Sequence, residues 1–551
     1  MENKEPEVII EDKDYDSLLD KFENPTTSKP PKKKKSTGIK ALIIAILCAV
    51  VLGTVVCLLI FVPQSSEITD SAKDGEAVKT GLNDKKEWQA NVKTDKKGKI
   101  NTNAGGQFTE KVPADIKTIE LENNGGKLSI KSYTPTKKTK ETDPETGDPV
   151  EKSEATEYTV VGYEDMALQS GVADEIASAC STLEFTKIVD KNGSSHLSDY
   201  GLDKPKAIAK VTYTDNTTAT IKVGNAAPQN LGTYVMFGSG MEVFLCNSDS
   251  TKALLFTLCD LASLTINEAA SDNDKNEFKY VTVNGVTMKP SKYTDQIENK
   301  YVLDDGSFAD ENEASLVSGA IRGLYATGVA AVNPTAAQIS DFGLKNPKAS
   351  IKADYPDIDV ELIASKADKK GDCYLMEKDG KIVYKIASTS LPWLNTNREK
   401  LTDKYILHVK LSGLKGMQVE SNGKKYDFDV KTTVTKTTDS EGEESESTNT
   451  VTKYMGNEID EGYFETFLNN VSMLKYEKGK IKNSGTNCPL KIKYTYEKNR
   501  PADTLAFTKS GNQYVAILNG KAIGFVYRSY VEKLIDQPGK VAVDKEVKSF
   551  W

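Results

Sequence analysis

The chain has little of what catalytic and metal sites usually need. Its 551 residues include only two histidines, His196 and His408, and no Cys-x-x-Cys pair. A zinc ribbon is therefore excluded, and a histidine-rich metal site would have to recruit carboxylates. His196 lies beside Ser194 and Ser195 in a loop-like stretch, and His408 lies in an apolar strand-like stretch. We expect both to be ordinary structural residues rather than partners of a nucleophile.

Cysteines are also few and scattered. Five of the seven lie beyond residue 63, which is an odd number, and they show no clustering: Cys180, Cys246, Cys259, Cys373 and Cys488. A secreted disulfide framework has an even, clustered set. We therefore predict free cysteines that act as small core residues.

Signatures of nucleotide and nucleic-acid binding are missing. The sequence has no phosphate-binding Gly-Lys-Ser/Thr loop and no G-x-G-x-x-G after a strand. Its net charge of −8 argues against a nucleic-acid partner. Ser421 to Lys424 match the spacing of a Ser-x-x-Lys nucleophile, but the Asn-Gly pair between them predicts a hairpin turn. We expect no cofactor, nucleotide or nucleic acid, and we assign no catalytic residue.

The chain does contain one long apolar run, residues 41–62, which carries no charge. As a helix it would be about 33 Å long, enough for a hydrocarbon core of about 30 Å. Lysines cluster before the run but not after it. The positive-inside rule then predicts a cytoplasmic tail (1–38), a transmembrane signal anchor in the cell membrane (39–63) and an extracytoplasmic remainder. A cleaved signal peptide would be shorter and nearer the N-terminus.

Residues 64–112 are polar and predict a linker, and the chain repeats from residue 113 onward. Residues 197–215 align without gaps on residues 339–357, with ten of nineteen positions identical. The shared Gly201/Gly343 and Pro205/Pro347 predict a short turn that leads into a strand.

A second repeated block predicts three hairpins. They begin at Tyr234, Tyr374 and Tyr514, which follow one another at a constant spacing along the sequence. The last two hairpins turn on Asp-Gly and Asn-Gly, which are strong hairpin signals. Helical spacing predicts an amphipathic helix before each hairpin and a short helix after it, over 172–183, 313–324 and 463–474, and over 250–258, 388–394 and 529–535.

These patterns predict an α+β protein. A single N-terminal transmembrane helix would be followed by three tandem repeats of about 140 residues, each an antiparallel sheet with helices, over 113–266, 267–404 and 405–551. Two polar inserts, 133–156 and 431–452, predict long hairpins.

One row of acidic residues is a weak candidate for a metal site. Asp357, Asp359 and Glu361 alternate along a predicted strand, so they would project from one face and could hold a hard cation. Such a row is more often the solvent face of an edge strand, where charge prevents pairing with other chains.

The repeated blocks Ser198-Asp-Tyr-Gly-Leu-x-x-Pro-Lys-Ala207 and Ser340-Asp-Phe-Gly-Leu-x-x-Pro-Lys-Ala349 resemble the bacterial family called domain of unknown function 4340. The resemblance covers residues 113–540. It implies a membrane-anchored, repeated exterior domain, and some relatives are associated with ABC-type transporters of the gliding-motility kind. It implies no catalytic residue. The third copy departs from the pattern, since it keeps only Cys488-Pro489 before its strand.

We therefore expect a membrane-anchored extracytoplasmic binding or scaffolding protein rather than an enzyme. Tandem copies multiply binding surface, whereas catalysis needs one assembled site. Its expected partners are the lipid bilayer, through residues 41–62, and a transporter subunit or a cell-wall polymer. The alternative is an envelope hydrolase that uses carboxylates at an inter-domain cleft, because such pairs need no fixed spacing in the sequence.

Overall fold

The computed structural model describes residues 77–78, 81–95, 97, 99–142, 149–270, 277–438, 444–481 and 487–550. The predicted transmembrane segment, residues 41–62, and the predicted tail before it lie outside these residues. Among the described residues, no helix combines the length and the apolar character needed to cross a bilayer.

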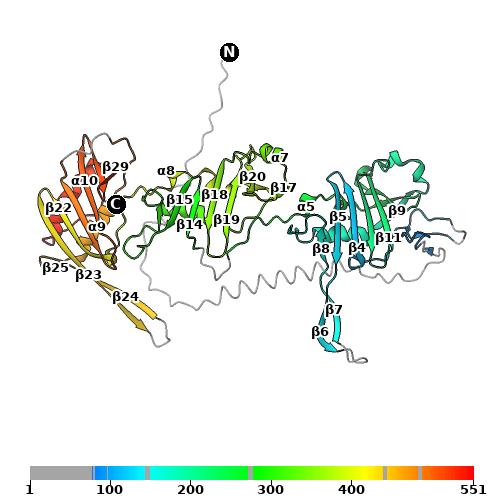
Figure 1. The fold of residues 1–551 in the computed structure, drawn as a ribbon, viewed down its shortest axis with the longest axis horizontal. Coiled ribbons are helices and arrows are strands. Elements are labelled where there is room, and N and C mark those ends of the chain that lie inside the picture. The colour runs from blue at the N-terminus through cyan, green and yellow to red at the C-terminus, as the bar shows by residue number, and fades with distance from the viewer. Residues whose placement is uncertain are drawn as a thin grey trace, which may run out of the picture. The chain divides into compact units, whose positions relative to one another are not determined.

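Three antiparallel sheets form the frame (Figure 1). The first contains β3 (Gly106–Gln107), β4 (Ile116–Asn123), β5 (Gly126–Tyr133), β8 (Glu157–Val160), β9 (Glu184–Asp190), β10 (Ala207–Tyr213), β11 (Thr218–Ala226), β12 (Thr233–Phe237) and β13 (Val243–Cys246). The second contains β14 (Tyr280–Val283), β15 (Val286–Pro290), β16 (Tyr301–Leu303), β17 (Gly328–Val332), β18 (Ala349–Asp354), β19 (Asp359–Ala364), β20 (Asp372–Glu377) and β21 (Ile382–Ala387). The third contains β22 (Leu414–Ser421), β23 (Lys424–Thr438), β24 (Glu444–Tyr454), β25 (Asn457–Ile459), β26 (Leu490–Tyr496), β27 (Asp503–Ser510), β28 (Gln513–Leu518) and β29 (Lys521–Tyr527). Two short strand pairs lie outside them, β1 (Ala77–Val78) with β2 (Val92–Lys93) and β6 (Thr136–Thr142) with β7 (Pro149–Ser153).

The same strand order recurs in the three sheets. Apart from β3, which pairs with β9 at its edge, the first runs β8-β5-β4-β10-β11-β12-β13-β9, and the second runs β16-β15-β14-β18-β19-β20-β21-β17. Apart from β25, which pairs with β24 at its edge, the third runs β24-β23-β22-β26-β27-β28-β29, and one bridge between Glu477 and Phe525 takes its last position. We call three neighbouring positions strand b, strand a and strand e: β5, β4 and β10 in the first sheet, β15, β14 and β18 in the second, and β23, β22 and β26 in the third.

One helix packs on one face of each sheet and precedes its later strands, the last five in the first two sheets and the last four in the third: α3 (Val172–Ser181), α6 (Glu311–Ser318) and α9 (Glu461–Ser472). Short helices follow the last strand, α4 (Ser248–Lys252) with α5 (Leu258–Leu261), two 3-10 turns (Ser388–Ser390 and Pro392–Asn395), and α10 (Arg528–Ile535) with α11 (Gln537–Val541). Two further helices are α7 (Ala336–Asp341) and α8 (Arg398–Leu401). The predicted α+β class with antiparallel sheets is confirmed.

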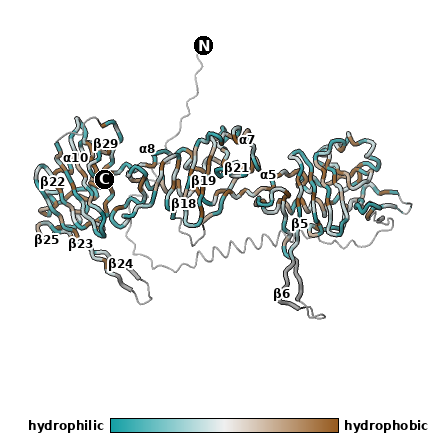
Figure 2. The backbone as a smooth tube through the Cα atoms, in the orientation of Figure 1, coloured by the Kyte–Doolittle hydropathy of each residue, from teal (hydrophilic) through white to brown (hydrophobic). Residues whose placement is uncertain are grey.

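Each sheet buries one face under its helices and leaves the other face more open. Along β26, Leu490, Ile492 and Tyr494 are buried, whereas Lys491 and Lys493 between them are exposed. The buried residues join one face of α9, whose Phe464 and Phe467 are fully buried in the same core. Apolar and polar residues accordingly alternate along many strands (Figure 2). Burying one such phenylalanine contributes about 2–3 kcal/mol, so the covered face supplies most of the stability.

The repeated Ser-Asp-aromatic-Gly-Leu block forms a small lid on the open face of the first two sheets. Tyr200 packs edge-on against Tyr234 with 5.0 Å between ring centroids, and Phe342 packs on Tyr374 at 4.6 Å. Gly201 has φ +66°, a conformation that glycine adopts without strain. The block is therefore a packing element, and its glycine makes the turn.

The third hairpin is confirmed, but its leading tyrosine is not equivalent to the other two. Tyr514 packs in the main core of the third sheet, whereas Tyr234 and Tyr374 pack in the clusters under the lids. A one-residue shift of register moves every side chain to the other face of a sheet. The alignment predicted from the constant spacing of the tyrosines is therefore wrong by a single position in the third copy.

The segment predicted as a linker, residues 64–112, is in part packed on the first sheet. The indole N–H of Trp88 donates to Thr217 Oγ1 at 2.9 Å, and Ala90, Val92 and Phe108 are buried in the first core. These apolar residues pack the described part of 81–112 onto the sheet, so this part belongs to the first body rather than to a tether.

The two polar inserts form hairpins, as predicted. β6 pairs with β7, and β23 pairs with β24 as far as Thr438 and Glu444. In the second sheet the same connection, residues 291–300, packs into the third body instead. Ile297 is fully buried in the third core and forms a bridge with Val409.

Candidate binding groove on the third sheet

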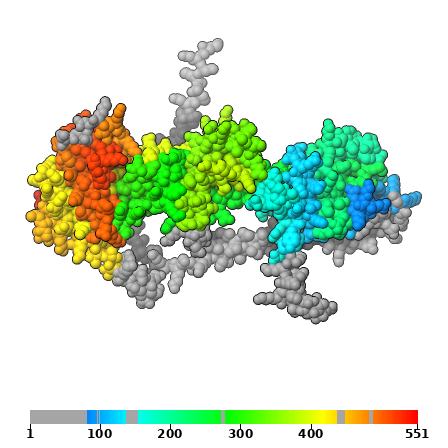
Figure 3. Space-filling view, viewed as in Figure 1, coloured from blue at the N-terminus to red at the C-terminus, as the bar shows by residue number. Residues whose placement is uncertain are grey.

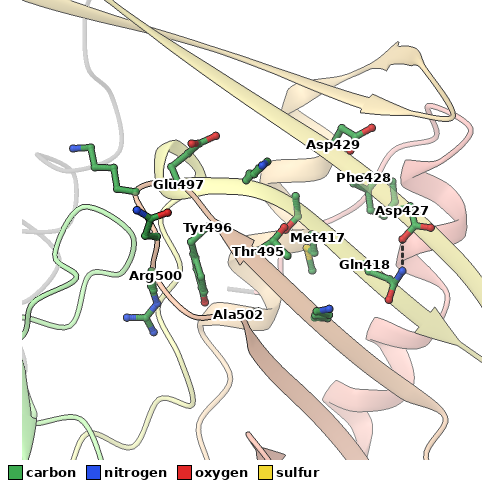
Figure 4. A pocket seen from close by; sticks show the side chains of 15 residues that line it. Met417, Gln418, Asp427, Phe428, Asp429, Thr495, Tyr496, Glu497, Arg500 and Ala502 are labelled. Carbon is green, nitrogen blue, oxygen red and sulfur yellow. Dashed lines mark hydrogen bonds between the residues drawn. The ribbon is translucent and has the colours of Figure 1, made fainter.

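The candidate site is a groove of about 720 Å³ on the open face of the third sheet. Its floor is formed by strand b, strand a and strand e, which are β23, β22 and β26, and the loop 497–502 lies beside them (Figure 4). The groove is open to solvent. Figure 3 shows the third body, which carries it, as space-filling atoms in yellow to red.

The strand register places its side chains in two rows. Gln418 lies opposite Asp427 on one side and Lys493 on the other, and the amide of Gln418 donates to Asp427 Oδ1 at 2.7 Å (Figure 4). In the next row Gly416 lies opposite Asp429 and Thr495. Carboxylates therefore line the strand-b side, and a lysine lines the strand-e side.

A glycine leaves a depression in the middle of the floor. A Cβ on Gly416 would lie 2.9 Å from the carbonyl oxygen of Phe428 and 3.3 Å from Thr495 Oγ1. The Thr495 hydroxyl donates to the Gly416 carbonyl at 3.0 Å. The ladder between β22 and β26 is also irregular between Leu414 and Gly416. The close approach of the neighbouring strands thus requires a glycine at this point.

A buried ion pair fixes the loop beside the groove. One guanidinium nitrogen of Arg500 lies 2.6 Å from Asp503, and the Tyr496 hydroxyl donates to the same carboxylate oxygen at 2.8 Å. The guanidinium also lies 4.7 Å from each of two ring centroids, those of Tyr496 and Tyr293. Burial raises the pKa of Tyr496, so its hydroxyl stays protonated and donates. The Arg500 and Asp503 side chains are only 7% and 10% exposed, so this contact is rigid.

The groove carries charges that have no ion-pair partner. Among the described residues, Lys415, Lys493 and Asp429 have none. On the matching strands of the first sheet, Lys127 lies 3.3 Å from Glu122, while Glu120 and Lys210 are likewise without an ion-pair partner in the described part of the chain. Because no described residue pairs with Lys415, Lys493 or Asp429, a ligand can supply the opposite charges.

A smaller groove of about 340 Å³ occupies the matching strands of the first sheet, where Glu120 and Lys210 line it. Sequence reasoning missed both grooves. The signal was present as alternating charged residues on strands b, a and e, but the rows form only once the register between strands distant in the sequence is known.

The three predicted metal-ligand residues, Asp357, Asp359 and Glu361, have different partners in the structure. Asp357 lies in the turn before β19, where both of its oxygens pair with the Arg322 guanidinium at 3.0 and 2.8 Å. That hydrogen bonding lowers the pKa of Asp357. Glu361 lies 2.7 Å from Lys378 and 3.6 Å from Lys352.

Asp359, the remaining candidate, begins β19 opposite Asp354. A cation would therefore have to displace the three basic side chains that already neutralise its neighbours. Within the described ranges, no group of three histidine, cysteine, aspartate or glutamate residues is arranged to hold a metal ion.

Neither histidine faces a nucleophile in the described part of the chain. His196 is 58% exposed, and its Nδ1 lies 3.5 Å from Asp190, while the Ser195 hydroxyl donates to a backbone carbonyl. His408 is largely buried and packs edge-on against the Tyr405 ring at 4.4 Å. Burial lowers the pKa of His408.

The five cysteines of the described residues are free, as predicted. Cys180, Cys246 and Cys373 are buried, and burial raises the pKa of each thiol. Cys488 is exposed, so the predicted core role is wrong for that residue.

Comparison with known proteins gives one family. Its model, described as "Domain of unknown function (DUF4340)", matches residues 159–330 and again residues 309–480. No curated protein and no solved structure matches the chain. The first match runs from β8, before α3, into β17, and the second runs from just before α6 to just after the bridge at Glu477. Since the two matches together span more than half of the sequence, this chain belongs to the DUF4340 family.

Proposed function

We propose that this protein is a membrane-anchored extracytoplasmic binding or scaffolding protein, and that the groove on the third sheet contacts its ligand. The observation that carries the proposal is the set of charges around the depression at Gly416, namely Lys415, Lys493 and Asp429, which have no ion-pair partner among the described residues. Small-molecule sites are usually enclosed and mostly apolar. An open polar groove suits a polymer or an extended segment, such as a cell-wall polymer or a subunit of an ABC-type transporter.

We also propose that the three sheets are tandem copies of one folding unit. Two observations support this: the shared strand order and the ten identical residues between 197–215 and 339–357. The reduction of the last strand of the third sheet to one bridge and the loss of the Gly-Leu-x-x-Pro block are then changes specific to the third copy.

The topology has a direct test in Cys488, the exposed cysteine of the third body. Cys259 is only partly buried, so the test uses a Cys259→Ser chain. A membrane-impermeant maleimide added to intact cells should modify this chain, and a further Cys488→Ser should abolish that labelling. Because Cys180, Cys246 and Cys373 are buried, they give little background. Labelling of Cys488 only after the cells are opened would overturn the extracytoplasmic placement.

The binding role is tested by photo-crosslinking in cells that produce the full chain. A photoreactive amino acid at Gln418 should yield an adduct with an envelope polymer or a membrane protein. The same amino acid at Glu120, on strand a of the first sheet, is the matched control. No adduct at Gln418, or equal adducts at both positions, would contradict the proposed site.

One observation favours the alternative, an envelope hydrolase. Asp427 and Asp429 are two residues apart on β23, so their backbones are about 7 Å apart. Inverting glycosidases hold their two carboxyl groups about 6.5–9.5 Å apart. The pair lies on one sheet, not at the inter-domain cleft that the sequence argument required. Release of soluble sugar from purified cell-wall material by the full chain, lost in Asp429→Asn, would favour the hydrolase over the binding role.

A further inference from the structure

We infer that the groove on the third sheet takes a short zwitterionic peptide, bound extended across the strands. The peptide amine would contact Asp427 and Asp429, and its carboxylate would contact Lys493. This inference rests on the proposed binding role of the groove and names the chemical class of its ligand.

The charges of the groove are separated in a way that a single ion cannot match. Asp427 and Asp429 both project from strand b, whereas Lys493 projects from strand e, with strand a between them. Two strand spacings of about 4.8 Å place the acidic and basic sides about 10 Å apart. A simple cation or a simple anion would satisfy only one side.

An extended peptide has the right length for this separation. It advances about 3.4 Å per residue, so three residues span about 10 Å. A tripeptide with free ends therefore carries an amine and a carboxylate at the spacing of the two sides of the groove.

The middle of the groove can accept a peptide backbone. Gly416 lies between Asp429 and Thr495 in the strand register, so no side chain rises from the floor between these two residues. Gln418 uses its N–H on Asp427, and Thr495 uses its O–H on the Gly416 carbonyl. The side-chain oxygens of Gln418 and Thr495 then remain as acceptors for peptide N–H groups.

The matching groove of the first sheet lacks this arrangement. Its Lys127 and Glu122 already pair at 3.3 Å, and Lys210 lies directly opposite Glu120 on the adjacent strand. Opposite charges there are neighbours rather than separated. We therefore assign the zwitterionic ligand to the third sheet alone.

The test uses the full chain in detergent micelles and ligand-observed NMR titration with three probes: trialanine, N-acetyl-trialanine and trialanine amide. Exposed ion pairs are individually weak, so each cap should weaken binding about threefold or more. Asp429→Asn and Lys493→Gln should each do the same, and the control Glu120→Gln should leave trialanine binding unchanged. Equal binding of capped and free peptides, no binding at all, or insensitivity to both groove variants would overturn the inference.

A second arm separates the two sources of such a peptide, a free peptide and a peptide borne by an insoluble wall polymer. Co-sedimentation with purified cell-wall polymer that is lost in Asp429→Asn would identify the polymer as the source, and trialanine binding without co-sedimentation would identify a free peptide. Crosslinking at Gln418 without trialanine binding would refute the ligand class and leave the binding role standing. Failure of both measurements would refute both.

Discussion

Replacing Arg500 by alanine should destabilise the third body far more than any exposed ion-pair substitution. Asp503 would keep two donors, the Tyr496 hydroxyl at 2.8 Å and the Asn519 amide at 2.7 Å, but it would lose its only cation among the described residues. An uncompensated buried charge costs about 3–5 kcal/mol. Loss of contact with the Tyr293 and Tyr496 rings adds to this cost.

A loss of about 4 kcal/mol corresponds to about three decades in the local opening equilibrium, since each 1.4 kcal/mol is tenfold. Hydrogen exchange of the full chain, read by mass spectrometry, resolves this loss for each sheet separately. The amides of β26 and β27 should exchange about a thousandfold faster, while those of the first sheet should not change. Such resolution matters because one unfolding midpoint is not well defined for a chain of several bodies.

Arg322→Ala is the matched control, because Arg322 also pairs with an aspartate and lies over a tyrosine ring at 5.2 Å. Its partner Asp357 is 39% exposed, so water can hydrate the carboxylate that is left behind. The cost should then be about 1 kcal/mol, less than a tenfold change in exchange. Equal effects of the two substitutions, or less than a tenfold effect of Arg500→Ala, would refute the reasoning from burial.

Three further results are expected. Burial lowers the pKa of His408, so as the pH falls the unfolded chain binds a proton near pH 6.5 before the folded chain does. Residues 405–410 should therefore lose stability below about pH 6.5. His408→Phe should remove this pH dependence, measured by hydrogen exchange corrected for intrinsic rates. Hydrogen bonding from Lys111 lowers the pKa of Asp215 to about 2. The ionised carboxylate therefore contributes to folding stability above about pH 4, and this contribution is lost as the pH falls toward 2. Lys111→Met should return the titration midpoint of Asp215, followed by NMR, toward about 3.9. Gly201→Ala should destabilise the fold by about 1–3 kcal/mol, because Gly201 has φ +66° and a Cβ there would lie 2.5 Å from a neighbouring side chain. Gly343→Ala should cost less, because its Cβ would meet its nearest atom at 3.6 Å. The reverse order of the two variants in thermal unfolding would contradict this.

Local patterns were enough to predict the class of the fold. The Asp-Gly and Asn-Gly pairs after Tyr374 and Tyr514 predicted hairpins, because the left-handed backbone of these turns favours those residues. Asp379 and Asn519 do adopt positive φ angles there. The polar inserts were predicted as hairpins for a different reason: they lie between strand-like stretches and contain too few apolar residues for a core.

Contacts between distant segments could not be predicted in this way. Nothing in the polar composition of residues 81–95 shows that Trp88 packs on the first sheet, because its partner, Thr217, is 129 residues away. The face of the sheet on which Tyr514 lies depends on a register shift of one residue, which the spacing of residues in the sequence does not show. The groove could not be predicted for a similar reason, because Asp427, Gln418 and Lys493 form a row only through two strand pairings.

The bounds of the family matches do not coincide with the bounds of the sheets. Both matches, 159–330 and 309–480, cross from one sheet into the next. Each includes the later strands of one sheet and the earlier strands of the following one. Sequence similarity therefore extends over the connection between sheets as well as over the sheets themselves.

The course of residues 291–300 decides how this protein can be divided. Because Ile297 is fully buried in the third core, a fragment that ended near residue 404 would expose this side chain to water, and a fragment that began there would lack part of its own interior. Tyr293 would likewise lose the guanidinium that it covers. Truncation between these two bodies should therefore give aggregation-prone products, and a protease that cuts at that boundary should release no stable half.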